Sequence, residues 1–206
     1  IEGWSGKTNF DRLITYPGTT QKDLKTGSAY ANNFLDYHNL MRKKCSYSSK
    51  TMQWNETLAK YASDYAKLLV RENNCEMSHT FKGHDSYKDF GAGENLAKII
   101  HIIPTLDEGA RKAMNGWGGE GYKENKTQDM TGHYTAMMWK NNVQLGCGMG
   151  INKEKKCAIV ACNYGSTPYT NQGLEQDYEK QVLCTRPINI GVDDKPGNNT
   201  VYYLPE

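Results

Sequence analysis

The chain has 206 residues, enough for one domain with a sizeable core, and its 25 basic and 23 acidic side chains leave a formal net charge of +2. The basic residues are scattered along the sequence, so they favour neither a nucleic-acid partner nor a strongly anionic membrane. No apolar run approaches the ~20 residues that cross a bilayer, so no transmembrane segment is expected. The opening residues, Ile1–Gly3, lack the charged and apolar regions of a signal peptide.

The cysteine content is even, and no two cysteines have the C-x-x-C spacing of zinc clusters or thioredoxin-like sites. The six cysteines are Cys45, Cys75, Cys147, Cys157, Cys162 and Cys184. We expect three disulfides made in an oxidising compartment, with the pairing left open; the alternative is a set of buried free thiols. Three N-glycosylation sequons, at Asn55, Asn125 and Asn198, also favour a secreted, extracellular glycoprotein.

The first half of the chain predicts two helices. Residues 1–27 are polar and turn-rich and are expected to form an N-terminal extension. A first helix is predicted from Ser28, because apolar side chains recur there at helical spacing: Tyr30, Phe34, Tyr37, Leu40 and Met41. The second helix begins after Asn55, a good N-cap residue, and has the clearest apolar stripe: Leu58, Ala59, Ala62, Tyr65, Ala66 and Leu69. Residues 72–91 are predicted to form a loop.

The third predicted helix carries a capping box. Thr105 would cap its first turn, and Glu108 would reach back to the cap from three residues later. The helix should run to about Trp117, where several glycines are expected to end it. A long polar loop over 122–131 and a short fourth helix over Tyr134–Lys140 follow.

Two strands close the predicted domain, over about Val143–Met149 and Cys157–Tyr164, with a lysine-rich turn between them. Helices followed by a hairpin indicate an α+β fold with helices packed on both faces of a small, mainly antiparallel sheet. The Gly-, Pro- and Asn-rich remainder is expected to be an extended tail tethered by a disulfide. The expected parts are an N-terminal extension over 1–27, a single domain over 28–170 and a C-terminal extension over 171–206.

Two histidines and two glutamates are candidates for a shared cleft. His79 lies four residues after Cys75, whose disulfide would fix its loop, and His133 lies at the predicted start of the fourth helix. Glu94 and Glu120 stand beside glycines, which allow backbone conformations that aim side chains into a cleft. The spacing alone leaves open whether the four side chains meet or are solvated loop residues, because neither an H-x-x-x-H pair nor a G-x-S-x-G elbow is present.

Several short motifs resemble, in order, those of the CAP superfamily (SCP/TAPS: sperm-coating protein, antigen 5 and pathogenesis-related proteins). They are His38-Asn39-Leu40-Met41-Arg42, Trp54-Asn55-Glu56-Thr57-Leu58-Ala59, Gly91-Ala92-Gly93-Glu94-Asn95-Leu96-Ala97, Gly132-His133-Tyr134-Thr135 with Trp139, Leu145-Gly146-Cys147-Gly148 and Cys162-Asn163-Tyr164. Within the superfamily the chain most resembles the venom allergen-like proteins of parasitic worms. The resemblance covers about Ser28–Tyr164 and implies a three-layer α-β-α sandwich with a large central cavity.

The resemblance also implies a site. In that superfamily two histidines and two glutamates line the cavity, and matched motif by motif they fall on His79, Glu94, Glu120 and His133. His79 and His133 would bind Zn²⁺ or another divalent cation weakly, as a ligand that is not obligatory. The chain departs from the family pattern in two places. The proline after the Cys-Asn-Tyr motif comes later, at Pro168, and Ala136 replaces the polar glutamine that follows Gly-His-Tyr-Thr in the family.

The favoured function is a secreted, non-enzymatic lipid-binding protein that acts at a host or extracellular interface and takes a sterol or a fatty acid. The candidate lipid-binding residues are apolar side chains of the first and fourth helices and of the loop between the third and fourth: Phe34, Tyr37, Met137, Met138, Tyr122 and Met130. Methionine is deformable and suits such a pocket. The alternative for each of these side chains is an ordinary place in the core.

Two other functions remain open. The chain could be an extracellular interaction or immune-modulating module with a vestigial cavity and host proteins as partners. It could also be a metal-dependent hydrolase in which a histidine-bound metal activates water and Glu94 or Glu120 is the general base. A two-histidine site without a nucleophile motif is only part of such an apparatus, so no catalytic residue is assigned and no enzyme is expected.

Overall fold

The computed structural model describes residues 21–45, 51–79, 93–121, 128–165, 180–182 and 184–194. Its elements are α2 (Gln21–Lys44), β1 (Gln53–Trp54), α3 (Glu56–Glu72), β2 (Gly93–Ile100), α5 (Leu106–Gly119), α6 (Gln128–Met138), β3 (Gln144–Asn152) and β4 (Cys157–Gly165). The four strands form one sheet in the order β1-β3-β4-β2. β1 runs parallel to β3 and the other neighbours are antiparallel, which confirms the mainly antiparallel sheet. Within the described ranges, no helix has the length and apolar character that a bilayer span requires.

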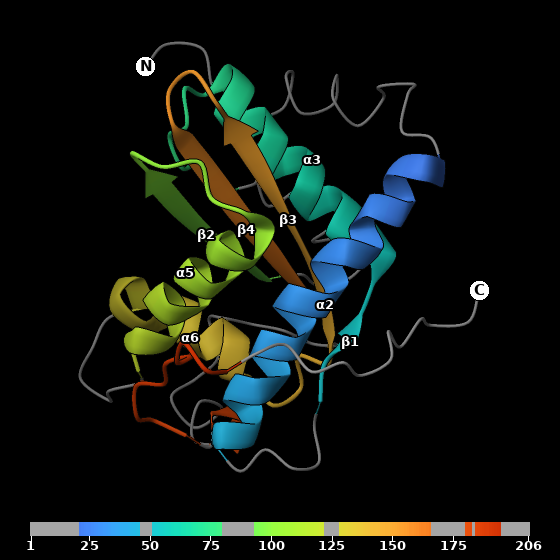
Figure 1. The fold of residues 1–206 in the computed structure, drawn as a ribbon. Helices are drawn as coiled ribbons and strands as arrows, with labels where there is room; N and C mark the ends of the chain where they lie inside the picture. Colours follow the sequence, from blue (N-terminus) through green and yellow to red (C-terminus); the bar gives the residue numbers. More distant parts are fainter. Residues whose placement is uncertain are drawn as a thin grey trace.

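Helices cover both faces of the sheet (Figure 1). α3 packs against β3 and β4 on one face, and α2, α5 and α6 pack on the other. All of β4 is buried, and its side chains alternate between the two layers. Val160 and Cys162 join the cluster beneath α2, α5 and α6, whereas Ile159 and Ala161 join the cluster beneath α3. The α+β prediction, with helices on both faces, is therefore confirmed.

α3 lies very close to β3 because the strand carries a glycine at every second position. These are Gly146, Gly148 and Gly150. A Cβ added to Gly148 would lie only 2.3 Å from the Cα of Ser63 on α3. Between the glycines, Cys147 belongs to the cluster of the opposite layer. The alternation therefore lets a helix backbone rest on one face of β3 while the other face builds a side-chain core.

Two strands and two helix starts differ from the sequence predictions. β1 and β2 were not predicted, so Glu94 stands on a strand rather than beside a flexible glycine loop. α2 begins at Gln21, inside the predicted extension over 1–27, rather than at Ser28. α6 begins at Gln128 rather than Tyr134, so the loop predicted over 122–131 extends too far and His133 lies within a helix.

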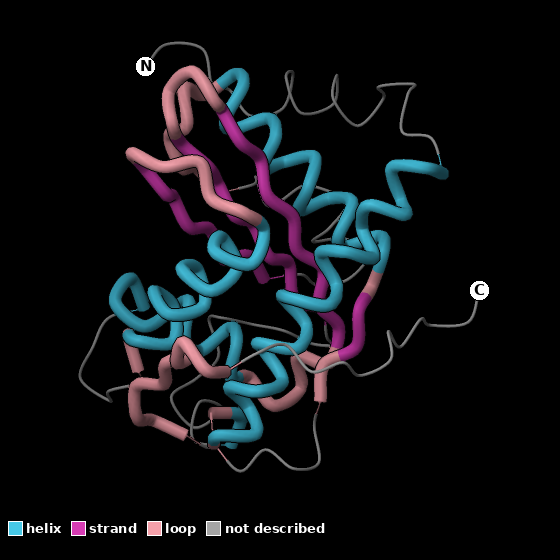
Figure 2. The backbone as a smooth tube through the Cα atoms, viewed as in Figure 1, coloured by secondary structure: helices cyan, strands magenta, loops and turns pink. Residues whose placement is uncertain are grey.

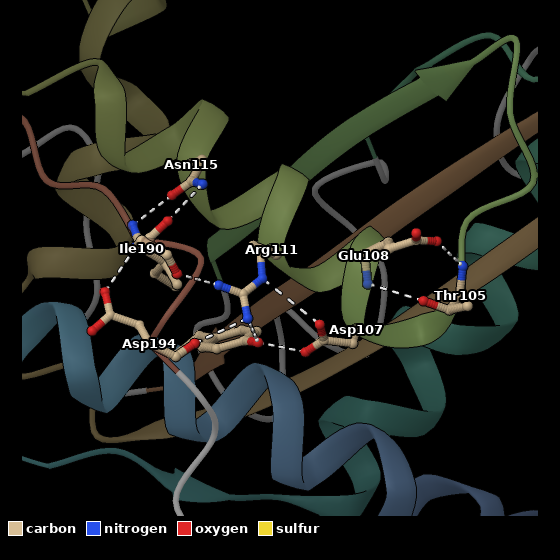
Figure 3. A network of polar contacts seen from close by, with 9 residues as sticks. Thr105, Asp107, Glu108, Arg111, Asn115, Ile190 and Asp194 are labelled. Carbon is tan, nitrogen blue, oxygen red and sulfur yellow. Dashed lines mark hydrogen bonds and ion pairs between the residues drawn. The ribbon is translucent and has the colours of Figure 1, made fainter.

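The start of α5 was predicted correctly and its end was not. Thr105 accepts from the Glu108 N–H while the Glu108 side chain accepts from the Thr105 N–H, which completes the capping box (Figure 3). The helix continues through the glycines to Gly119. A Cβ on Gly118 would lie 2.5 Å from the Ile188 carbonyl oxygen and 2.8 Å from Met41 Cε. Glycine is therefore required there by close packing, and it does not terminate the helix.

All six cysteines are paired, as expected for an oxidised protein. The pairs are Cys45–Cys184, Cys75–Cys157 and Cys147–Cys162. Cys147 and Cys162 face each other directly across β3 and β4, which places that disulfide inside the sheet. The other two disulfides hold the end of α2 to the C-terminal segment and the segment after α3 to the start of β4.

The C-terminal segment 184–194, called the strap below, is bound along α5 mainly through its backbone (Figure 3). Arg111 donates to the carbonyl oxygens of Gly191 and Asp194, the latter at 2.9 Å. Asn115 exchanges two hydrogen bonds with the backbone of Ile190, at 2.7 and 3.1 Å. The strap also buries its isoleucine side chains in the main core. The disulfide that was expected to tether the C-terminal tail is Cys45–Cys184.

Candidate functional site

The four candidate cleft residues form two histidine–glutamate pairs. His79 Nδ1 lies 2.9 Å from Glu94 Oε1, and His133 Nδ1 lies 2.6 Å from Glu120 Oε1. Among the residues that the structure describes, no group of three or more His, Cys, Asp or Glu side chains is placed to hold a metal ion. The predicted tetrad is therefore present as two pairs and does not form a cluster of three ligands.

The His79–Glu94 pair joins an exposed imidazole to a covered carboxylate. Glu94 extends from β2 and its side chain is only 2% exposed, whereas the His79 side chain is 60% exposed. The hydrogen bond to Glu94 raises the pKa of His79, and partial burial of the ring opposes that shift. The segment carrying His79 is held by the Cys75–Cys157 disulfide, as the sequence predicted.

In the His133–Glu120 pair both side chains are partly exposed, His133 at 34% and Glu120 at 22%. Glu120 is the C-cap of α5, and its second oxygen accepts from the backbone N–H of Tyr134 at 3.2 Å. The His133 ring also stacks on Trp117, with 6.2 Å between the ring centroids. One carboxylate thus holds both the ring and the backbone of α6, which fixes the direction of the imidazole.

Among the residues that the structure describes, both pairs leave the same ring nitrogen without a hydrogen-bond partner. A carboxylate accepts hydrogen bonds, so Nδ1 carries the proton in the neutral form of His79 and of His133. Nε2 then has the free lone pair. Histidines that bind metals commonly have this arrangement, in which a carboxylate fixes the tautomer and makes the ligating nitrogen more basic. Each of the two imidazoles is therefore held in the tautomer whose Nε2 can bind a divalent cation.

A buried hydrogen-bond chain connects this site to α2. The Asn95 amide donates to the His133 carbonyl oxygen at 2.9 Å and to the Tyr164 hydroxyl at 3.0 Å. His38 Nε2 lies 2.9 Å from that hydroxyl, and His38 Nδ1 lies 2.7 Å from the Phe34 carbonyl oxygen. Nδ1 must donate to the carbonyl, so Nε2 accepts from Tyr164. Burial lowers the pKa of His38 to about 3, which keeps the ring neutral.

The sequence did not predict this chain of hydrogen bonds. His38 and Asn95 stood in the quoted motifs, but neither had been given a role. Both side chains are 1% exposed, and a polar side chain at such a depth requires hydrogen-bond partners. The signal available in the sequence was the position of Asn95 next to Glu94 in the quoted motif. Its partner in α6 could not be read from the spacing.

The candidate lipid-binding residues are packed in the core where the structure describes them. Phe34, Tyr37, Met137 and Met138 are each at most 1% exposed. Tyr37 is also held by polar contacts, since its hydroxyl donates to Asp107 and accepts from Arg111. Tyr122 and the side chain of Met130 lie outside the described residues. The structure therefore shows close packing at the helix positions.

One sequon asparagine has a structural role. Asn55 is the N-cap of α3, accepting from the Leu58 N–H at 3.0 Å and donating to Gln144 at 3.0 Å. Glycosylation at Asn55 stays a prediction. Asn125 and Asn198 lie outside the described residues.

Comparison with known proteins settles the family. The chain matches CAP, the cysteine-rich secretory protein family, across residues 35–164, a range that holds both glutamates, both histidines and the Asn95–Tyr164–His38 chain. The chain belongs to the CAP family. The resemblance drawn from the sequence motifs is thereby confirmed.

Individual CAP proteins are similar over most of the chain. Pathogenesis-related protein 1 of Arabidopsis thaliana is 32% identical over 145 residues, which cover 68% of this chain and 79% of that protein. GLIPR1-like protein 1 of Bos taurus is 30% identical over 167 residues, covering 71% of this chain and 65% of that protein. The crystal structure of NaASP2 with Zn²⁺ superposes with a TM-score of 0.55 at 21% identity, covering 76% of this chain and 86% of that chain. That likeness shows a shared fold.

Proposed function

We propose that this CAP protein is a secreted, non-enzymatic binding protein that holds a divalent cation between His79 and His133. The observation that carries the proposal is the pair of imidazoles, each with Nδ1 on a carboxylate and Nε2 left for a ligand. Three disulfides and membership of a secretory family support an extracellular location. Zn²⁺ in the crystal structure of NaASP2, which shares the fold, supports zinc as the ion.

Two protein ligands favour reversible binding over hydrolysis. Catalytic zinc sites commonly have three protein ligands and an open position for water. Within the described residues this site offers two imidazoles, with the carboxylates engaged in orienting them. The cation would complete its shell with water or with an external ligand, and its affinity would be low.

Zinc binding should depend on both histidines. In calorimetric titration we expect weak binding by the wild type and none by a His79→Ala, His133→Ala variant. Because the hydrogen bond to Glu94 raises the pKa of His79, protons should compete with zinc at a higher pH than for an ordinary histidine, and affinity should fall as the pH is lowered. His101→Asn is the matched control, since His101 is exposed and asparagine tolerates its φ of 69°. Equal binding by the double variant and the wild type would place the site elsewhere.

A small lipid is the second ligand that we propose, and the specific observation is the methionine content of the core beneath α2, α5 and α6. That cluster contains Met41, Met52, Met114, Met137, Met138 and Met149. Unbranched thioether side chains change rotamer easily, so a fatty acid or a sterol could be admitted by rearrangement of a layer that is closed in the structure.

Stiffening this layer should weaken lipid binding. We expect a Met137→Leu, Met138→Leu variant to fold normally, because the volume is conserved, and to bind labelled palmitate less tightly than the wild type. Val192→Leu is the control, since Val192 is 86% exposed and lies outside this layer. The His79→Ala, His133→Ala variant should bind palmitate normally, because a polar site solvates an acyl chain poorly. If the wild type binds neither palmitate nor cholesterol, the lipid proposal fails and an extracellular interaction module becomes the better account.

A further inference from the structure

Three connections meet at one end of the sheet (Figure 2). They are residues 73–77 after α3, residues 100–104 at the end of β2, and residues 151–157 around the β3–β4 turn. We call these three segments the sheet tip. Ile100 lies at the opposite end of β2 from Glu94, whereas the first segment continues two residues past Met77 to His79 of the candidate cation site.

Several contacts hold the sheet tip together. The Cys75–Cys157 disulfide joins the first segment to the third. Lys98 on β2 forms an ion pair with Glu76 at 2.7 Å, which joins β2 to the first segment. Ile100 faces Cys157 directly across β2 and β4. These contacts tie together parts that are distant in sequence, with Ile100 on the α3 face of the sheet and Ile151 on the opposite face.

The sheet tip exposes most of the large apolar side chains found at the surface. The described residues have six exposed large hydrophobic side chains: Met77, Ile100, Ile102, Ile103, Ile151 and Val192. The first five belong to the tip, and each is between 38% and 50% exposed. Single exposed apolar residues are common on protein surfaces, but a group of five on one end marks an interaction site.

The backbone of the sheet tip is also unusual. Four residues other than glycine have a positive φ among the described residues: Asn74 at 54°, Cys75 at 60°, His101 at 69° and Lys156 at 47°. All four lie in the tip. Such conformations cost free energy in side-chain-bearing residues and collect where function requires them. Here they turn each connection sharply back at the end of the sheet.

The unpaired charge of the sheet tip is mainly positive. The acids of the α3 end are paired, Glu72 with Arg71 and Glu76 with Lys98. The β3–β4 turn carries three exposed lysines and one glutamate: Lys153, Lys155, Lys156 and Glu154. Within the described residues none of the three lysines has a carboxylate partner; Lys155 contacts the neutral side chain of Asn74. The three lysines lie in one short turn next to Ile151, and the fold brings that turn to the end of β2, which leads into Ile102 and Ile103.

We propose that the sheet tip docks on an anionic lipid membrane, with Ile100, Ile102, Ile103 and Ile151 entering the interface and the turn lysines binding lipid headgroups. The composition favours a membrane over a protein. Protein interfaces are rich in arginine and poor in lysine, whereas the three tip segments contain three lysines and no arginine. Lysines beside an anionic bilayer contribute about 1 kcal/mol each, and aliphatic side chains add burial at the acyl boundary.

Vesicle sedimentation tests this docking surface. We expect the wild-type protein to bind vesicles of phosphatidylcholine with phosphatidylserine, in a salt-sensitive manner, and to ignore vesicles of phosphatidylcholine alone. K153Q/K156Q should bind about thirty-fold more weakly, at about 1 kcal/mol per lysine. I102S/I103S should lose at least ~ten-fold, because the apolar contacts are removed.

Two matched variants control for charge and for exposed apolar surface. K43Q/K140Q makes the same change in net charge away from the tip, and V192S removes the one exposed large hydrophobic residue that the structure describes outside it. Both should bind like the wild type. Equal binding to both vesicle types, or tip variants that bind like the wild type, would overturn the proposal. Absent vesicle binding, together with a dimer that I102S/I103S abolishes, would instead show that the tip contacts a second copy of the chain.

Discussion

Replacing Gly148 by alanine should be among the most damaging single changes to this protein, with an expected loss of about 4 kcal/mol or more. The new Cβ would lie 2.3 Å from Ser63 Cα and 2.6 Å from the Ser63 backbone nitrogen. These atoms belong to the body of α3, which cannot move away easily because the segment following it is tied to β4 by the Cys75–Cys157 disulfide. In a thermal melt the loss corresponds to roughly 8–16 °C for a chain of this size.

Gly116→Ala is the matched control for that substitution. Gly116 lies on α5, and a Cβ added there would meet nothing within 4 Å. Alanine in an exposed helical position should be neutral or should stabilise by about 0.5–1 kcal/mol. Equal melting temperatures for the two variants would show that α3 yields to β3 and would contradict the close packing.

Removing the guanidinium of Arg42 should cost about 3 kcal/mol or more. Arg42 on α2 is 1% exposed, and it donates to the carbonyl oxygens of Met137 at 3.0 Å and Trp139 at 2.6 Å. These carbonyls lie at the C-terminal end of α6, where the helix dipole is negative and acceptors lack helical partners. Arg42→Met keeps much of the volume but leaves buried acceptors without a donor.

Denaturant unfolding of three variants distinguishes the effect of losing the Arg42 hydrogen bonds from the effect of losing a positive charge. Arg42→Lys keeps a charge but loses the planar fork that serves both carbonyls, so its stability should fall between the wild type and Arg42→Met. Lys43→Met removes a charge from the neighbouring exposed position and should change little. A stable Arg42→Met protein would mean that α6 does not depend on this side chain.

Local sequence signals predicted the elements that local interactions define. α3 and the start of α5 carry side-chain caps, at Asn55 and Thr105, and those boundaries were correct. β2 was missed because it lacks the alternation of buried and exposed residues that marks a strand with one solvent-facing side. Its consecutive residues Asn95 and Leu96 are both buried. The early start of α6 was missed because Gly132 disfavours a helix, and packing of α6 on α5 and β2 overrides that preference.

The candidate site was predictable as a set of residues but not as an arrangement. Motif resemblance placed His79, Glu94, Glu120 and His133, although spacing could not show that they form two pairs. Each pair spans separate elements, so its geometry depends on the sheet register and on helix packing rather than on any local pattern. The support that Asn95 gives to α6 has the same non-local origin.

The pairing of the cysteines sets an order on biosynthesis. No disulfide joins two cysteines that are consecutive in the sequence. During synthesis, the next cysteine to be added after any given one is therefore never its native partner. Cys157 and Cys162 both lie on β4, and Cys184 follows it, so every native bond waits for β4 or for the strap. A nascent chain that ends before β4 therefore contains no native disulfide, and oxidation before that point can only be undone by thiol–disulfide exchange.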